Sequence, residues 1–107
     1  MTVDAQMKRG LLEVCVLAAL VRHDSYGYRI IKDLSPCIAI SESTLYPILK
    51  RLESGQCLRV YSQEHNGRLR KNYHLTDAGR QRISDFLGEW QDVMDVYRFI
   101  EGEWKHE

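Results

Sequence analysis

The chain has 107 residues, 44% of them apolar and 28% charged, which allows one compact domain with a single core and argues against a second domain. Its longest apolar run, residues 14–21, is too short to cross a bilayer, and no secretory leader pattern is present, so we expect a soluble, cytoplasmic protein. Three widely spaced cysteines, Cys15, Cys37 and Cys57, form no Cys-x-x-Cys pair, and we interpret them as reduced structural thiols.

Charge is distributed unevenly along the chain although the formal net charge is zero. Residues 1–49 are balanced, residues 50–82 carry eight basic against three acidic side chains, and residues 83–107 carry two basic against seven acidic ones. This segregation predicts one surface that attracts phosphate and another that repels it. The alternative is an ordinary solvated surface without a binding role.

Two helices are predicted in the first third of the chain. Residues 5–22 are rich in helix formers and apolar nearly all round, so this helix must be covered by a second layer or by another subunit. The next helix follows Ser25 as its N-cap, carries apolar side chains on one side and ends before Pro36. The exposed apolar surface of the first helix is a first indication of a dimer.

A third helix is predicted to open at Ser41 or Ser43, to run to about Glu53 and to end at Gly55. Its apolar residues have the spacing of a buried stripe: Leu45, Ile48, Leu49 and Leu52. Two short strands, residues 58–64 and 69–75, then flank Asn66-Gly67, a strong signal for a β-hairpin.

The last helix is predicted to start after Thr76 and to run toward the carboxyl end. Its apolar residues alternate in steps of three and four: Ile83, Phe86, Trp90, Val93, Tyr97, Ile100 and Trp104. Such a seam packs lengthwise against a partner helix, so we predict a homodimer interface made by Leu11 with Ile83, Phe86, Trp90, Val93, Tyr97 and Ile100. The alternative is a helix docked on its own core, with the first helix covering part of the seam.

This order predicts a mainly α fold with a small β-hairpin: a winged helix-turn-helix plus a long C-terminal dimerisation helix. Residues 1–75 would form the DNA-binding domain and residues 76–107 the dimerisation helix, within one compact unit. In this arrangement the helix after the turn enters the major groove of double-stranded DNA, and the hairpin lies along the backbone or a minor groove.

Candidate DNA-binding residues follow from this arrangement. With its leucine stripe facing inward, the third helix would expose Ser43, Thr44, Tyr46, Pro47, Lys50 and Arg51. The hairpin tip supplies three cations, Arg68, Arg70 and Lys71, and Tyr26 at the start of the second helix lies where that helix crosses the backbone. The alternative from another class is a winged helix used only for protein–protein interaction, which would tolerate loss of these charges.

Three stretches of the sequence resemble the PadR family of bacterial repressors over about residues 7 to 97. They are Tyr26-Gly27-Tyr28, the run from Glu42 to Glu53 (ESTLYPILKRLE), and the run from Arg70 to Gly79 (RKNYHLTDAG). The short length and single last helix are similar to the compact subfamily, which dimerises through its first and last helices. The resemblance implies a repressor, and a two-fold dimer would read an inverted-repeat operator.

The same resemblance implies a ligand site between the subunits. In multidrug-sensing members a tryptophan on the last helix meets its dimer mate, and planar aromatic ligands stack between the two; Trp90 matches that position. The expected pore is lined by Met7, Leu11, Val14, Cys15, Phe86, Trp90, Val93 and Met94. Two alternatives stay open: Trp90 fills the interface without binding a ligand, or the protein binds DNA constitutively.

Catalysis and metal binding find no support in the sequence. The four histidines have no nearby nucleophile arrangement, no glycine-rich phosphate loop occurs, and no two Cys or His residues have ligand spacing. We therefore expect no enzyme activity, no catalytic residues, no cofactor, no metal and no membrane partner.

Overall fold

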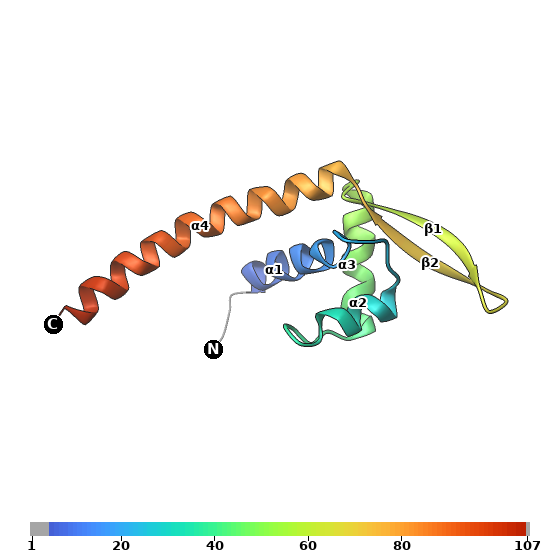
Figure 1. The fold of residues 1–107 in the computed structure, drawn as a ribbon, viewed down its shortest axis with the longest axis horizontal. Helices are drawn as coiled ribbons and strands as arrows, with labels where there is room; N and C mark the ends of the chain where they lie inside the picture. Colours follow the sequence, from blue (N-terminus) through green and yellow to red (C-terminus); the bar gives the residue numbers. More distant parts are fainter. Residues whose placement is uncertain (1–4, 107) are drawn as a thin grey trace.

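The computed structural model describes residues 5–106, with side chains from residue 8 onward. Four helices and one hairpin follow in the order α1 (Ala5–Ala18), α2 (Gly27–Leu34), α3 (Glu42–Ser54), β1 (Leu58–His65), β2 (Arg68–Leu75) and α4 (Asp77–Lys105). Helices α1, α2 and α3 form a compact head, from which the hairpin projects on one side and α4 on the other (Figure 1). The predicted winged helix-turn-helix with a long last helix is confirmed.

The core lies between the three helices of the head and the base of the hairpin. All four residues of the predicted α3 stripe are buried, and α1 contributes the opposite wall. The remaining core positions come from α2, from the strands and from two connecting residues, Leu20 after α1 and Cys57 before β1. The largest fully buried side chains include Leu17, Leu20, Ile30, Leu45, Leu49, Leu52 and Leu58.

The ends of α3 and α4 are fixed by the residues that the sequence indicated. Ser41 caps α3, with its Oγ accepting from the backbone N–H of Thr44, and Gly55 is the C-cap. Thr76 caps α4 by accepting from the N–H of Gly79, and its hydroxyl also donates to the carbonyl of Gln56. The second contact ties the start of α4 to the loop between α3 and β1.

The predicted cap of α2 is wrong. The N-cap residue is Tyr26, which makes no side-chain capping bond, whereas Ser25 is buried and pairs its backbone with Tyr73 of β2. Both backbone hydrogen bonds between Ser25 and Tyr73 are made, at 3.2 and 2.8 Å. Ser25 therefore acts as an extra strand position beside the hairpin, and α1 ends earlier than predicted, at Ala18.

The hairpin pairs β1 and β2 antiparallel from Leu58↔Leu75 to His65↔Arg68. Asn66 and Gly67 form its two-residue turn with φ values of 52° and 78°, the left-handed conformation that this dipeptide favours. Apolar and buried residues are concentrated at the base, while the tip is exposed. The hairpin is therefore anchored at one end and presents polar side chains at the other.

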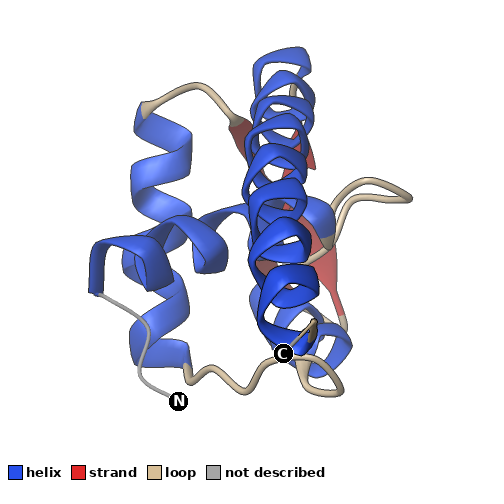
Figure 2. Ribbon diagram, turned by 90° about the vertical axis from the view of Figure 1, so that its left-hand side faces the viewer, coloured by secondary structure: helices blue, strands red, loops and turns tan. Residues whose placement is uncertain are grey.

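Helix α4 leaves the head after its first half, and the molecule extends over 65 Å. Figure 2, seen along the long axis with the C-terminal end nearest the viewer, shows this helix in front of the head. Ile83, Phe86 and Trp90 are half-buried near α1, but the apolar residues further along are exposed. The exposed set is Val93, Met94, Val96, Tyr97, Phe99, Ile100 and Trp104.

Candidate nucleic-acid interface

Helix α3 presents a polar face on the side opposite its buried stripe. All six residues predicted to lie there are exposed: Ser43, Thr44, Tyr46, Pro47, Lys50 and Arg51. At the N-terminus of this face, the Ser41 hydroxyl donates to Thr44 Oγ1 at 3.2 Å and lies 2.9 Å from Ser43 Oγ. The face thus combines hydroxyl groups, an aromatic ring and cations, the side-chain types that contact DNA bases and phosphates.

Tyr46 and Gly27 set the contact between the two helices of the helix-turn-helix. A Cβ at Gly27 would lie 2.9 Å from Tyr46 Oη and 3.3 Å from its Cζ, so only glycine lets the Tyr46 ring rest against the first turn of α2. This contact gives a physical reason for glycine at position 27 opposite the ring of Tyr46. Tyr46 remains 47% exposed, which leaves it available on the α3 face.

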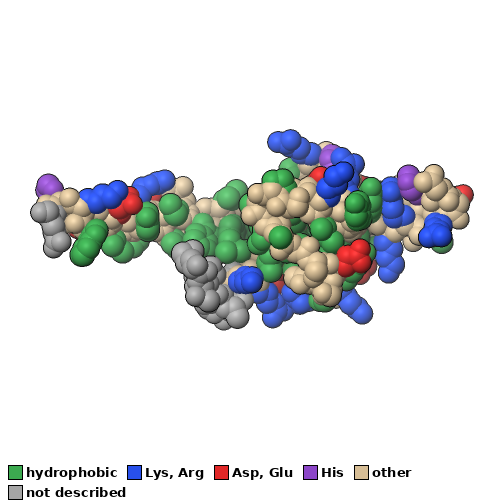
Figure 3. All heavy atoms as spheres, turned by 90° about the horizontal axis from the view of Figure 1, so that it is seen from below, with side chains coloured by type: hydrophobic (Ala, Val, Ile, Leu, Met, Phe, Trp, Pro, Cys, Tyr) green, Lys and Arg blue, Asp and Glu red, His purple; other side chains and the backbone are tan. Residues whose placement is uncertain are grey.

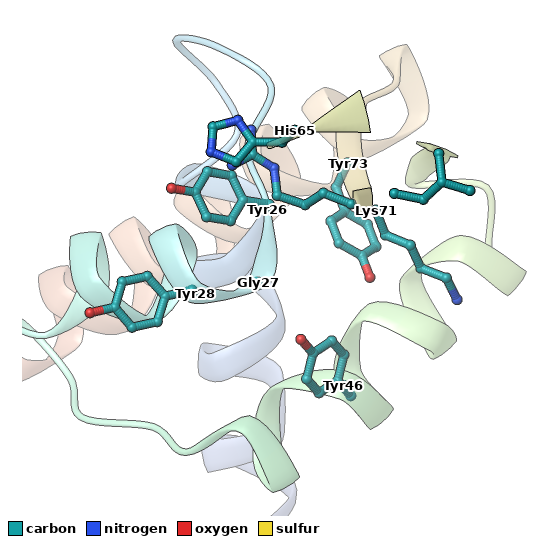
Figure 4. Close-up of a pocket in the computed structure, with 9 residues that line it drawn as sticks. Tyr26, Gly27, Tyr28, Tyr46, His65, Lys71 and Tyr73 are labelled. Atoms are coloured by element: carbon teal, nitrogen blue, oxygen red, sulfur yellow. The ribbon is translucent and has the colours of Figure 1, made fainter. Parts of the chain in front are cut away.

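A cleft of about 540 Å³ separates the hairpin from α2 and α3. Its walls carry side chains from all three elements: Tyr26, Gly27, Tyr28, Tyr46, His65, Leu69, Arg70, Lys71 and Tyr73. In Figure 4 the hydroxyls of Tyr46 and Tyr73 point toward each other across the floor of this cleft. Burial is the main cause of a raised pKa at Tyr73, so its hydroxyl stays protonated and able to donate.

Arg70 is held in place by an aromatic ring. Its guanidinium carbon lies 3.7 Å from the centroid of the Tyr26 ring, a cation–π contact between the hairpin and the start of α2. The Arg70 Nε is buried and has no hydrogen-bond partner among the described residues. The contact orients the Arg70 side chain while leaving its charge on the wall of the cleft.

Lys50 and Lys71 bring the two predicted surfaces together. They line one smaller groove of about 260 Å³ with Tyr46 and Tyr73, so the face of α3 and the hairpin are continuous. Arg68 lies further out, beside the turn. Figure 3 shows Lys and Arg side chains around the hairpin, at the end of the molecule opposite the projecting end of α4. The hairpin end of the molecule thus carries the cations that the sequence placed there.

Asp24 anchors the base of the hairpin. Its carboxylate accepts from the Tyr61 hydroxyl at 2.7 Å and lies 2.8 Å from His74 Nδ1, so one side chain before α2 contacts both strands. The hydrogen bond from Tyr61 is the main cause that lowers the pKa of Asp24, with His74 and Arg59 acting in the same direction. The direction of the hairpin relative to α2 depends on this anchor and on the Ser25–Tyr73 pair.

Sequence reasoning missed the contribution of α1 to the same surface. Lys8 and Arg9 lie beside Ser43, Thr44 and Arg51, on the side of α3 away from the hairpin. The contact is tertiary, and the only local signal was the spacing of Arg9 and Glu13, which form an ion pair one helical turn apart.

The predicted dimer and pore residues lie along α1 and α4. Phe86 and Trp90 pack together with ring centroids 5.8 Å apart, and Leu11 and Cys15 are half-buried. Val14 is buried within the chain, Val93 and Met94 are exposed, and the side chain of Met7 lies outside the described part. The three thiols are free: Cys57 is buried, Cys15 half-buried and Cys37 exposed.

Fold and surface define a winged helix-turn-helix protein of the kind that binds DNA. A family model, the transcriptional regulator PadR-like family, matches residues 16–85. The chain therefore belongs to the PadR-like family of transcriptional regulators. Among residues 5–106 no helix is long and apolar enough to span a membrane.

Solved structures agree with this assignment. A Streptococcus mutans protein is 45% identical, with 88% of this chain and 90% of that chain covered and a TM-score of 0.77. A PadR-like transcription factor from Bacteroides fragilis is 31% identical, with 90% and 95% covered and a TM-score of 0.81. Bacillus subtilis PadR, solved in complex with operator DNA, is 26% identical with a TM-score of 0.66; the match covers 72% of this chain but 46% of that longer one.

Proposed function

We propose that this protein is a transcriptional repressor that binds an inverted-repeat operator as a homodimer. The observation that carries the proposal is the continuous surface formed by the exposed face of α3 and the cationic hairpin, joined at Lys50 and Lys71. A helix in the major groove flanked by a hairpin along the backbone needs this combination of hydroxyls and cations. A repressor acts by occupying the promoter, so operator binding is the property to test.

The roles of the individual residues follow from their chemistry. Tyr46 and Thr44 contact base edges and thymine methyl groups, while Lys50 and Arg51 contact guanine or phosphate, with Ser43 and Pro47 beside them. On the hairpin, Arg68, Arg70 and Lys71 contact phosphates or the minor groove. Tyr26 lies where α2 crosses the backbone and orients Arg70 through the ring contact.

The second half of α4 supports the homodimer. Seven large apolar side chains are exposed there, and Trp104 is 72% exposed. Clusters of exposed apolar side chains are typical of interaction sites. A second copy would cover Val93, Tyr97 and Ile100 through the same helix, with Leu11, Ile83, Phe86 and Trp90 completing the interface. The two recognition helices would then lie about 34–36 Å apart, one turn of DNA.

Release by a planar aromatic ligand is the regulatory part of the proposal. The Phe86–Trp90 pair and the half-buried Leu11 and Cys15 lie where two copies of α1 and α4 would meet. Paired indoles in an apolar cavity favour flat ligands, often cationic ones. The dimer would have one arrangement of its subunits that fits the operator and another that does not. Such a ligand lowers operator affinity only if it binds the second arrangement more tightly than the first.

Operator binding is tested with the chain's own upstream DNA, using a shuffled duplex as control at two salt concentrations. We expect the wild type to bind its own DNA specifically. In Lys50→Ala and in Arg68→Ala, the slope of log binding constant against log salt concentration should become shallower by about 0.9 for each phosphate that is no longer neutralised, or about 1.8 for a dimer. The matched control is Lys105→Ala at the far end of α4. Equal binding to both duplexes at low salt would favour the protein–protein interaction module instead.

The ligand is tested by fluorescence. The chain has two tryptophans, so Trp104→Phe leaves Trp90 as the single reporter. We expect planar cationic dyes to quench Trp90 emission and to weaken operator binding in parallel. Two results would point instead to a constitutive DNA binder in which Trp90 only fills the interface. Either the dyes quench the fluorescence of Trp90→Phe as much as that of Trp104→Phe, or they quench neither.

A further inference from the structure

A buried carboxylate in α1 collects three arginines from three helices. Glu13 is only 7% exposed, and Arg82 Nη2 of α4 donates to its Oε2 at 2.7 Å. Arg9 of α1 and Arg51 of α3 approach its Oε1 less closely, each through Nε, at 3.4 and 3.7 Å. The cluster therefore joins the first helix, the recognition helix and the last helix at one point.

The cluster has more positive than negative charge. Arginine side chains stay protonated in proteins, so three cations share one carboxylate, and Arg82 takes the short hydrogen bond. Arg9 and Arg51 are the looser partners, with side chains that are 59% and 38% exposed. Cations that are held in place but not neutralised favour an anion beside them.

A groove of about 340 Å³ runs between α1 and α3 next to these arginines. Lys8 adds a further cation, and two hydroxyl residues of α3 lie on the opposite wall. Leu12, Pro47 and Ile48 complete the lining. Guanidinium, ammonium and hydroxyl groups converging on one groove are the groups that bind a phosphate.

The position of this groove on α3 points to the DNA backbone. Ser43, Thr44 and Arg51 face the groove, while Tyr46, Lys50 and Glu53 face the hairpin on the other side of the helix. Successive positions on a helix turn by about 100°, so these two sets flank the same exposed face. A helix that lies in the major groove has a phosphate backbone on each side.

We infer that the α1–α3 groove binds a backbone phosphate of the DNA through Lys8, Arg9 and Arg51. The inference rests on the proposed function, because it adds a second phosphate site to the same interface. The hairpin contacts the DNA on one side of α3, and the N-terminal part of α1 contacts it on the other side. Glu13 supplies the counter-charge that keeps Arg9 and Arg51 beside the groove.

The test compares wild type with Lys8→Ala/Arg9→Ala, whose two side chains are exposed so that their loss spares the core. We expect the salt slope of operator binding to fall by about 0.9 for each phosphate that is no longer neutralised, or about 1.8 for a dimer. Duplexes with one neutral methylphosphonate at each position locate the phosphate. At the contacted position, the methylphosphonate should weaken binding of the wild type but leave binding of the double variant unchanged. The control Lys105→Ala should behave like the wild type.

Three outcomes would overturn the inference. If wild type binds specifically but the double variant has the same slope and the same methylphosphonate profile, the groove does not contact DNA, although the proposed function stands. If the double variant instead weakens self-association by sedimentation with an unchanged slope, the groove holds the acidic α4 of a second copy. If wild type does not bind the operator, the proposed function itself falls.

Discussion

The head and the second half of α4 carry similar apolar patterns but use them differently. In the head, residues such as Leu45 and Leu52 are fully buried by the same chain, whereas Ile100 and Trp104 on α4 are mostly exposed. Hydrophobic burial stabilises a fold only where something covers the side chain. The apolar side chains of the head are therefore covered within the chain, whereas those of the far half of α4 are covered by nothing in the described part of the same chain.

The largest expected effect tests the self-sufficiency of the head. Leu45→Ala removes a side chain with 0% exposure and leaves a cavity in the core of the head, so the free energy of unfolding should fall by about 3 kcal/mol. Chemical denaturation followed by circular dichroism measures it. A loss below about 1 kcal/mol would mean that the head is loosely packed.

The second prediction concerns the far half of α4. Ile100→Asp places a charge in the proposed seam of both copies, so the dimer dissociation constant should rise by roughly a hundredfold while the fold of the head is retained. Sedimentation equilibrium measures it, with Gln91→Asp as a control that adds the same charge outside the seam. If both variants dimerise like wild type, a different surface joins the subunits.

The third prediction concerns the contact inside the helix-turn-helix. Gly27→Ala forces the Tyr46 ring away from α2 and should lower the free energy of unfolding by about 1 kcal/mol, with weaker operator binding. Tyr46→Phe removes the Oη atom that would lie closest to the new Cβ at position 27. The double variant Gly27→Ala/Tyr46→Phe should therefore lose less stability than the sum of the losses in the two single variants. Strict additivity in thermal denaturation would show that the two residues are not coupled.

The pattern of correct and wrong predictions follows the range of the interactions. The α3 stripe, the Asn66-Gly67 turn and the Thr76 cap were predictable because each depends on neighbours a few residues away. Ser25 was predicted as a cap because the sequence gives no sign of its backbone pairing with Tyr73, which comes 48 positions later. Tertiary strand pairing displaced a local preference there.

The candidate site divides in the same way. The exposed face of α3 and the three hairpin cations follow from helix and strand periodicity, and so were predictable. Glu13 and Arg82 are 69 residues apart, and the groove beside Arg9 exists only because α1 packs alongside α3. No local pattern encodes such contacts, so only the assembled head reveals them.

The smallest predicted effect concerns the hairpin anchor. The pKa of Asp24 lies below its ordinary value of 3.8, so its charge stabilises the folded state above that pH and the contribution is lost as pH falls through the lowered pKa. Asp24→Asn should cost less than about 1 kcal/mol at pH 7, because the pair is exposed. Urea denaturation measures the difference in the free energy of unfolding between the variant and the wild type, which should shrink below pH 3.8. A difference that does not change with pH would mean that the packing of the side chain, and not its charge, stabilises the hairpin.

The central claim is that two heads, joined through α4, read one operator. Hydroxyl-radical footprinting of the protein on its own upstream DNA tests this most directly. We predict two protected patches related by two-fold symmetry, with centres about 10–10.5 base pairs or a multiple of that apart. A single protected half-site, or protection that a shuffled sequence shows equally, would contradict the account.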